Sequence, residues 1–513
     1  MLVKTYGSAV YGVNALTITI EVNVTGGQKF YMVGLPDSAV KESEQRIESA
    51  LKTTGHYFPR TKVIVNLAPA DIRKTGTAFD LPIAISILAA TEQMEQPDRI
   101  AEYVIMGELG LDGSIHPIKG ALPIAIQARK EQFKGLIVPL QNAREAGMVN
   151  NLNVYGVSHL SDVIRFFKDE NTLQPVEVNT REEFLHAQTT FDNDFNDVKG
   201  QINIKRALEI AAAGSHNAIL IGPPGAGKTM LAKRLPSILP PLSLQEALET
   251  TKIHSVAGKL PQNATLISKR PFRSPHHTIS DAALVGGGTH PQPGEISLAH
   301  NGVLFLDELP EFKRTVLEVM RQPMEERHVM ISRAKIAIDF PASFMLIASM
   351  NPCPCGFYNH PDKECTCPPG AVQKYLNKIS GPLLDRIDLH VEVTPVPFSE
   401  LSKASPSESS AAIRERVILA RDIQSERYKE IEGIYANAQM NSKLLKEICV
   451  ISQAGQTLLK AAMDKLNLSA RAYDRILKVS RTIADLDRSP DIKVEHLAEA
   501  IQYRSLDREG WAG

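Results

Sequence analysis

The chain has 513 residues, 43% of them hydrophobic and 22% charged, a composition typical of a globular protein with roughly three or four domains. Lys and Arg number 57 and Asp and Glu 58, so the net charge of -1 excludes an overall basic field, and any nucleic-acid contact would need a local basic surface or a ring interior. No apolar run could span a membrane, and no apolar signal core follows Met1. The 5 cysteines do not suggest a disulfide framework. We therefore expect a cytoplasmic protein.

The first region, residues 1–167, is predicted to be a self-contained α/β unit. Alternating apolar and polar residues predict half-buried strands, and longer apolar patterns predict helices. The expected strands are 16–22 and 62–67, and the expected helices are 38–53 and 82–90. A polar stretch with little periodicity, residues 168–196, is predicted to be a linker.

A phosphate-binding loop of the form G-x-x-x-x-G-K-[ST] lies in the second region, residues 197–395. Its residues are Gly222, Pro223, Pro224, Gly225, Ala226, Gly227, Lys228 and Thr229. A strand at 217–221 and a helix at 230–235 flank it, which is the context that this motif requires. The glycines let backbone N–H groups turn onto a phosphate, Lys228 reaches the β- and γ-phosphates, and Thr229 can hold Mg²⁺. The pattern therefore predicts a Mg²⁺-dependent nucleotide site rather than a chance turn.

An apolar strand at 302–306 ends in two carboxylates, Asp307 and Glu308. The first can orient Mg²⁺ through its water, and the second can polarise the attacking water as a general base. By itself such a strand end is more often a solvated turn. Its position downstream of a phosphate loop favours the catalytic interpretation.

A third buried strand, 344–350, ends at Asn351. Ligands bind at the carboxyl ends of strands in open α/β sheets, so this amide is expected beside the other strand ends, where it can position the lytic water. The alternative is a turn-forming Asn before Pro352.

Four cysteines follow Asn351 as two C-x-C pairs: Cys353, Cys355, Cys365 and Cys367. Four thiolates can close a tetrahedral Zn²⁺ site with a structural role, although the C-x-C spacing is shorter than usual. The alternative is a set of reduced thiols in a Pro-rich loop. Because exposed free thiols are a liability, we favour the metal. His360 is a possible substitute ligand, and Cys449 is expected to be buried.

Two arginines complete the catalytic candidates. Arg386 lies in a G-P-L-L-D-R-I-D segment, and Arg471 follows Ser469, which can cap a helix. An arginine that stabilises charge on the transferred phosphoryl group can come from a neighbouring subunit, which would imply a ring or a partner. Taken alone, each would be a surface salt-bridge former.

The chain beyond residue 395 is predicted to be helical. A Pro- and Ser-rich stretch, residues 396–410, reads as a second linker, and residues 411–513 read as a helical lid domain. The expected helices are 411–428, 442–451, 455–466, 469–486 and 493–503.

The order of these motifs resembles that of AAA+ ATPases: the phosphate loop, Asp307 and Glu308, Asn351, Arg386 and Arg471. Residues 272–280 with Gly286–Gly288 look like the helix-2 insertion of the magnesium-chelatase/MCM branch, and residues 333–340 look like its extra β-hairpin. Over nearly its whole length the chain resembles the YifB/ComM family of magnesium-chelatase-like ATPases. The resemblance implies ATP and Mg²⁺ as cofactors, and it makes Asn351 the first sensor, Arg386 the arginine finger and Arg471 the second sensor.

The N-terminal region resembles the Lon protease domain, an S5-like α/β fold, through residues 74–80 and 107–113. Peptidases of this type need a Ser nucleophile activated by Lys. Ala78 aligns with the Ser and Pro123 falls near the Lys, so no acyl-enzyme can form. We expect a non-proteolytic relative, which disfavours an ATP-driven protease. Asp80 and Lys119 are then ordinary fold-stabilising residues.

The family resemblance further implies a homo-hexameric ring and a DNA helicase that promotes branch migration in natural transformation or recombination, with recombination proteins as possible partners. Basic residues in the two insertions are candidate DNA contacts: Lys269, Arg270, Arg273, Arg333 and Lys335. They could instead be solvated surface cations. The competing hypothesis is a chelatase-type motor that remodels a protein partner.

Overall fold

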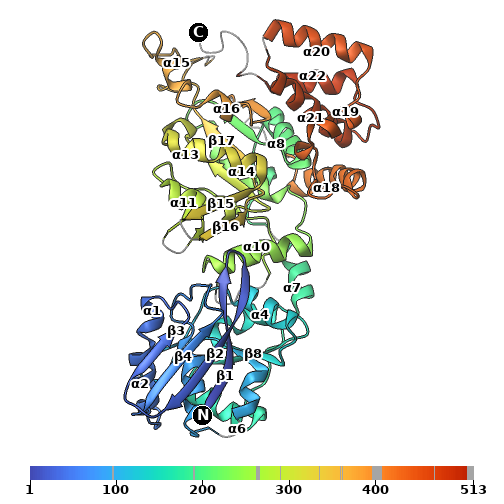
Figure 1. Ribbon diagram of the computed structural model, residues 1–513. Coiled ribbons are helices and arrows are strands. Elements are labelled where there is room, and N and C mark those ends of the chain that lie inside the picture. The colour runs from blue at the N-terminus through green and yellow to red at the C-terminus, as the bar shows by residue number, and fades with distance from the viewer. Residues whose placement is uncertain are drawn as a thin grey trace. The chain divides into compact units, whose positions relative to one another are not determined.

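In the computed structural model the chain forms two compact units (Figure 1). The first comprises Met1–Ala187, Leu244–Ser268 and Ser332–Phe340, and the second comprises Gln188–Ser243, Lys269–Ile331 and Pro341–Gly513. The structure describes residues 1–94, 97–188, 191–261, 266–288, 291–333, 336–358, 360, 362–395, 407–466, 468–504 and 506. No helix among these residues is long and apolar enough to cross a membrane.

A mixed seven-stranded sheet forms the centre of the first unit, in the order β3-β4-β2-β1-β5-β8-β9. The strands of this unit are β1 Leu2–Tyr11, β2 Asn14–Thr25, β3 Phe30–Val33, β4 Lys62–Ala68, β5 Tyr103–Ile105, β6 Glu108–Leu109, β7 Ile115–His116, β8 Gly135–Pro139 and β9 Asn153–Val157. β1 pairs antiparallel with β2, and β5, β8 and β9 continue the sheet in parallel.

Helices cover this sheet, and one of them is buried on every side. They are α1 Ser38–Lys41, α2 Ser43–Thr53, α3 Asp80–Ala90, α4 Ala121–Lys130, α5 Leu140–Gly147, α6 Leu160–Lys168, α7 Thr180–Ala187 and, from later in the chain, α10 Leu244–Val256. All residues of α3 are buried, and it packs on β1 and β2. A helix that is apolar all round belongs in a core, which explains why its sequence lacks a polar face.

The predicted linker at 168–196 contains α7 and two short 3₁₀ helices, Glu170–Thr172 and Phe195–Asp197. Phe184 and Phe195 are buried. Two apolar anchors therefore order a stretch whose overall composition is polar. The boundary between the two units falls inside it.

The second unit has a parallel five-stranded sheet in the order β11-β14-β17-β10-β18. Its strands are β10 Ala218–Ile221, β11 Phe272–Arg273, β12 Gly286–Gly287, β13 Gln292–Pro293, β14 Val303–Leu306, β17 Met345–Met350 and β18 Leu389–Glu392. A further pair, β15 His328–Arg333 and β16 Ile336–Pro341, forms the hairpin expected near 333–340 and is divided between the units.

Helices surround this sheet, and those from α18 onward make the expected helical region. They are α8 Ile202–Gly214, α9 Lys228–Arg234, α11 Asp281–Val285, α12 Glu295–Leu298, α13 Arg314–Val319, α14 Arg321–Glu326, α15 Ala371–Leu376, α16 Gly381–Leu384, α18 Ser410–Tyr428, α19 Ser442–Ile448, α20 Gln453–Leu466, α21 Ala470–Leu486 and α22 Val494–Gln502. One hydrophobic cluster joins the sheet to α18–α22. The α/β fold class, the parallel core sheet and the helical C-terminal region are thus confirmed.

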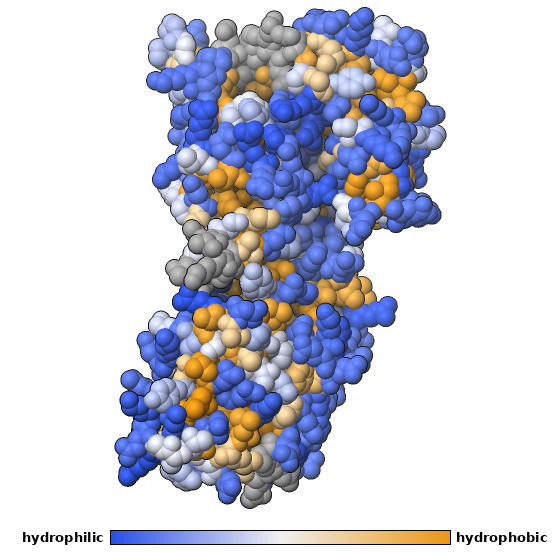
Figure 2. Space-filling model, in the orientation of Figure 1, coloured by the Kyte–Doolittle hydropathy of each residue, from blue (hydrophilic) through white to orange (hydrophobic). Residues whose placement is uncertain are grey.

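Hydrophilic residues cover most of the described surface on the face shown in Figure 2, with small apolar patches among them. Residues 396–406 of the second predicted linker lie outside the described residues. Ser409 then caps α18 by accepting a hydrogen bond from the Ala412 N–H.

A buried ion pair joins α2 to the start of α3. Asp80 is 1% exposed, and the Arg46 Nε and Nη2 donate to its two oxygens at 2.6 and 2.9 Å. Burial raises the pKa of Asp80, and the hydrogen bonds from Arg46 act in the opposite direction. Asp80 therefore depends on Arg46 to remain charged inside the core.

Replacing Arg46 by Met is expected to destabilise the first unit by about 3 kcal/mol, because it leaves the Asp80 carboxylate buried without its counter-charge. The matched control is Lys52→Met, which removes an exposed pair between Lys52 and Glu48 and should cost less than about 0.5 kcal/mol. Thermal denaturation followed by circular dichroism measures both. Equal midpoints for the two variants would show that the Asp80 pair contributes no more than a surface pair.

Candidate functional site

The phosphate loop connects a fully buried strand, β10, to helix α9, which begins at Lys228. Gly225 and Gly227 have φ angles of +80° and +85°, a region that side chains other than glycine rarely adopt. At Gly222 the constraint is space, because a Cβ atom there would lie 2.3 Å from the Val393 carbonyl oxygen. The glycine spacing is thus required by the backbone path between strand and helix.

The Lys228 ammonium links the loop to the end of β17. Its Nζ donates to the carbonyl oxygens of Gly222 at 2.6 Å and Pro223 at 2.9 Å, and to Asn351 Oδ1 at 3.1 Å. Lys228 is 9% exposed. Burial lowers its pKa, whereas the charges of Asp307 and Glu308 raise it. The structure therefore brings Lys228 and Asn351 together beside two carboxylates.

Asp307 lies where the loop meets two neighbouring strand ends. Thr229 Oγ1 donates to its Oδ2 at 2.7 Å, and the Ser349 hydroxyl donates to its Oδ1. The Thr229 and Ser349 hydroxyls and the Asp307 carboxylate therefore lie together. Oxygen groups of this kind, together with phosphate, are the ligands that Mg²⁺ prefers. Thr229 and Asp307 are thus the residues that would hold this ion.

Glu308 is more exposed to solvent than the neighbouring Asp307. Its backbone is left-handed, with φ at +54°, and its side chain is 60% exposed. The Nδ1 of His277 lies 3.6 Å from its Oε2. A carboxylate that is exposed and close to Lys228 and Asp307 has the solvent access that a general base for water requires.

Sequence reasoning missed the roles of Ser349 and Asn217, and it placed His277 only within the insertion at 272–280. Ser349 precedes Asn351 by two residues on a strand, so both project from the same face, a spacing that could have identified it. The Asn217 side chain donates to the Arg386 carbonyl oxygen at 3.1 Å and accepts from the Leu346 N–H at 2.8 Å. Residues so far apart carry no sequence signal for such contacts.

Arg386 and Arg471 lie on a different part of the second unit. Arg386 is 11% exposed, and its Nη2 is 2.6 Å from Glu325 Oε1. Arg471, 65% exposed, pairs with Asp385 at 3.0 Å. Among the described contacts, both arginines bind near α14 and α16 rather than the loop at 222–229. The two arginines are therefore grouped around Asp385.

The four cysteines gather in space. Their Sγ atoms all lie within 4.8 Å of one another, and the distances from Cys353 to Cys355 and Cys365 are 3.3 and 3.8 Å. Cys355 and Cys365 are 3.5 Å apart. Tetrahedral Zn–S bonds of about 2.3 Å place sulfurs about 3.8 Å apart, so the cluster has the size of a Zn²⁺ site. Cys449 is buried elsewhere.

The candidate DNA-binding cations are mostly engaged. Arg273 lies on β11 and forms two bonds of 2.6 and 2.7 Å to Glu295. Arg270 donates to the carbonyl oxygens of Pro240 and Asn301, and Lys269 lies over the Phe191 ring. Arg333 ends β15, and Lys335 lies outside the described residues. Several of the candidate DNA-binding cations are therefore already bound to groups of the protein itself.

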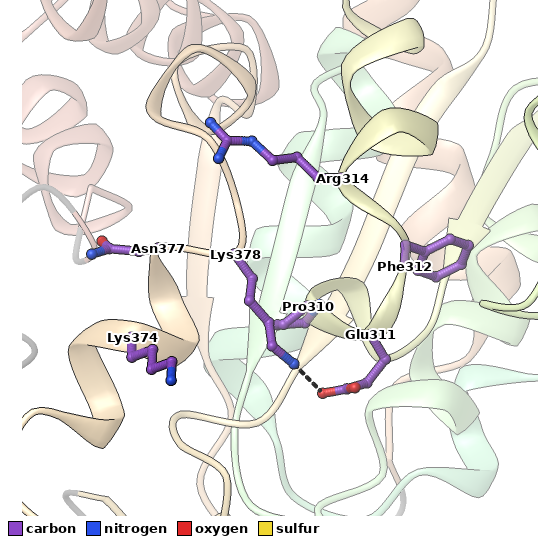
Figure 3. A pocket seen from close by; sticks show the side chains of 7 residues that line it. All are labelled: Pro310, Glu311, Phe312, Arg314, Lys374, Asn377 and Lys378. Atoms are coloured by element: carbon purple, nitrogen blue, oxygen red, sulfur yellow. Dashed lines mark hydrogen bonds and ion pairs between the residues drawn. The ribbon is translucent and has the colours of Figure 1, made fainter.

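A pocket of about 410 Å³ is lined mostly by polar and cationic residues (Figure 3). Its first lining residues follow Glu308 in the sequence. It is lined by Pro310, Glu311, Phe312, Arg314, Lys374, Asn377 and Lys378. Lys378 pairs with Glu311 at 3.2 Å, while Arg314 and Lys374 come from opposite walls. Three cations against one carboxylate give this surface a positive potential.

Comparison with known families divides the chain into three matching segments. Residues 194–401 match "Magnesium chelatase, subunit ChlI", residues 20–142 match "Subunit ChlI of Mg-chelatase", and residues 407–504 match "Magnesium chelatase, subunit ChlI C-terminal". The three segments cover the nucleotide site, the N-terminal region and the helical region, respectively.

Individual relatives extend over nearly the whole chain. The competence protein ComM of Haemophilus influenzae is 45% identical over 506 residues, covering 98% of this chain and 97% of ComM. The protein YifB of Salmonella typhimurium is 44% identical over 507 residues, covering 98% and 96%. Lon protease 2 of Bacillus subtilis is 31% identical over 154 residues, covering 27% of this chain and 26% of that protease.

Replacing Ser349 by Ala is expected to raise the Mg²⁺ concentration for half-maximal nucleotide hydrolysis about 10-fold or more, because residues that orient a metal-binding carboxylate affect metal affinity on that scale. The control is Ser297→Ala, since the buried Ser297 hydroxyl has no hydrogen-bond partner among the described residues. Hydrolysis measured across a Mg²⁺ titration tests this. An unchanged titration for Ser349→Ala would exclude the role in orienting Asp307.

Proposed function

This chain belongs to the family of magnesium-chelatase-like AAA+ ATPases that includes ComM and YifB, and we propose that it is an ATP-driven ring motor acting on DNA. Its action would be helicase activity or branch migration during recombination or natural transformation. The observation that carries the proposal is the 45% identity with a competence protein along almost the entire length of both chains. The proposal includes a cytoplasmic location and recombination proteins as partners.

ATP hydrolysis would use the residues gathered at the strand ends. The loop backbone and Lys228 bind the phosphates, Thr229 and Asp307 hold Mg²⁺, and Glu308 takes a proton from the attacking water. Bound Mg²⁺ would neutralise charge that develops on the phosphates. Asn351, which accepts from Lys228 at 3.1 Å, would turn to position the water as the first sensor.

Hydrolysis would be shared between subunits of a homo-hexamer. Arg386 would serve as the arginine finger for a neighbouring ATP, and Arg471 would be the second sensor. The proposal is supported by the described side-chain contacts of Arg386, which are with Glu325 and Pro382 and not with the loop of its own chain, because a finger supplied in trans has no role at its own nucleotide.

DNA would bind through cations in the two insertions and through backbone phosphates rather than bases. Arg270 and Arg273 already have partners, so they would bind DNA only after exchanging Pro240, Asn301 or Glu295 for a phosphate. Lys269, Arg333 and Lys335 complete the proposed set. The N-terminal unit would act without proteolysis, since Ala78 precedes α3 where the nucleophile is needed.

A second candidate is a chelatase-type motor that remodels a protein partner. It is favoured by the match of all three segments to a magnesium-chelatase subunit. The two candidates share the hydrolysis residues and differ only in what stimulates them.

We further assign the four-cysteine cluster a structural Zn²⁺. Four thiolates would fill all positions of a tetrahedral ion and leave none for catalysis. The metal would stiffen the segment between Asn351 and α15.

For the DNA motor, we expect branched or single-stranded DNA to raise ATP turnover, and we expect Lys228→Ala to lower turnover and branch migration about 100-fold or more, as the loss of a transition-state donor does. The control is Lys233→Ala, because Lys233 is exposed on the same helix. The measurements are phosphate release and a branch-migration assay at several salt concentrations, since phosphate contacts weaken with salt.

The DNA proposal would be wrong if the wild-type turnover ignored every form of DNA and the protein retained none at low salt. Stimulation by a protein partner instead would favour the chelatase-type function.

For the cysteine cluster, elemental analysis of reduced, purified protein should find about one zinc per chain. Cys353→Ser with Cys365→Ser should lose it, whereas Cys449→Ala should retain it, because Cys449 is buried away from the cluster. Protein without near-stoichiometric zinc would exclude this assignment.

A further inference from the structure

The pocket shown in Figure 3 is formed by two short segments of the second unit. One segment, residues 310–314, leads from the 3₁₀ helix Leu309–Glu311 into α13, and the other, residues 374–378, contains the end of α15 and the turn after it. Arg314, Lys374 and Lys378 line the pocket together with one carboxylate, Glu311. Three positive groups and one negative group give the lining a net charge of +2.

The lining of this pocket differs from that of a site for a small apolar ligand. Such sites are lined mostly by hydrophobic and aromatic side chains. Here the apolar lining residues are Pro310 and Phe312, and the Phe312 ring is 4% exposed, so it offers little surface on which a base could stack. The other lining residues are charged or carry an amide. The pocket therefore suits an anion that is held by its charge.

The cations of the pocket are available to such an anion. The side chains of Arg314 and Lys374 are exposed, and they form no ion pair or hydrogen bond within the part of the chain that the structure describes. Lys378 pairs with Glu311 at 3.2 Å, but the two side chains are 48% and 45% exposed. An ion pair as open as this is weak, so an incoming anion can replace it.

The cations of the helix-2 insertion are less available than those of the pocket. Arg273 is bound to Glu295 by two hydrogen bonds, and Arg270 donates to two backbone carbonyl oxygens. A phosphate would have to displace these partners, whereas at the pocket it would break one exposed pair. Since phosphate contacts supply most of the sequence-independent affinity for a nucleic acid, the pocket is the better prepared of the two surfaces.

The arrangement of the three cations favours a strand of phosphates over a single phosphate. Arg314 and Lys374 come from opposite walls, and the three side chains point in different directions rather than toward one point (Figure 3). A free nucleotide would also need a surface for its base, and the buried Phe312 does not provide one. Cations that are spread along a pocket match the repeated charges of a nucleic-acid backbone.

We propose that this pocket binds backbone phosphates of a nucleic-acid strand through Arg314, Lys374 and Lys378, as a site additional to the two insertions. Lys378 exchanges Glu311 for a phosphate, and the Asn377 amide supplies a further donor at the same wall. Contacts of this kind fix the position of a strand without reading its bases. This inference rests on the proposed function as a motor that acts on DNA.

The test measures binding of a fluorescent single-stranded oligodeoxythymidylate to the full-length protein over a range of salt concentrations. The double variant Arg314→Ala with Lys374→Ala removes two phosphate contacts, so the slope of log affinity against log salt should become shallower by about 1.4, or about 0.7 for each contact. Strands of other sequences should lose affinity by the same factor, because no base is read. The control is Lys460→Ala, an exposed lysine of α20 outside the pocket, which should keep the wild-type slope.

Glu311→Gln should act in the opposite direction. It frees Lys378 and removes the carboxylate that repels a phosphate, so binding should tighten and the slope should steepen by about 0.7. Melting midpoints of all variants, followed by circular dichroism, should stay near that of the wild type, because the substituted side chains are exposed.

A wild-type slope in the double variant, or binding in Glu311→Gln that is no tighter than in the wild type, would overturn the assignment of the pocket while leaving the DNA motor intact. A wild-type protein that retains no oligonucleotide at low salt would overturn both. Inhibition of ATP turnover by inorganic phosphate distinguishes a free anion from a strand. Weaker inhibition in the double variant, together with an unchanged salt slope, would mean that the pocket binds free phosphate instead of a backbone.

Discussion

The nucleotide site depends on the parallel register of three strands. β10 pairs with β17 so that Ile221 is opposite Met350, and β14 pairs with β17 so that Leu306 is opposite Ala348. Because parallel strands end at one edge, the residues that follow them meet there. The residues come from three distant parts of the chain, and this register brings Lys228 within hydrogen-bond reach of Asn351 and Thr229 within reach of Asp307. Any change that shifted one strand would separate the phosphate-binding lysine from the carboxylates.

The same sheet also anchors the helical region, and it does so with charge. Asp388 lies at the start of β18, buried against His216 and Arg475. A second buried carboxylate, Asp485, binds Arg427 and Arg481 within the helical region. Removing one partner of such a pair is costly because it leaves a charge without compensation. These pairs therefore fix the position of α21, because breaking either one would leave a buried charge uncompensated.

The N-terminal unit is proposed to keep a protease-like fold without proteolysis. It is similar to part of a Lon protease, and in the proposed alignment Ala78 stands where the nucleophile would be. Asp80, two residues later, is paired with Arg46 and stabilises the buried helix α3. The segments around α10 and the hairpin tip group with this unit rather than with the nucleotide core. The residues proposed to contact DNA are therefore divided between the units, with Arg333 in the first and Lys269, Arg270 and Arg273 in the second.

The sequence by itself determined the phosphate loop and the strand-end residues, because each of these depends on short spacings within one element. It also determined the family and the fold class, because these follow from the order of such motifs along the chain. Strand bounds at 217–221 and 302–306 differ from the structure by one residue. Tertiary structure alone decided which distant residues meet: Ser349 with Asp307, Asn217 with Arg386, and Asp388 with Arg475. These contacts join residues that lie tens to hundreds of positions apart. Periodicity and spacing describe only neighbours along one element, and such contacts exist only once strand order and helix packing have placed the elements side by side.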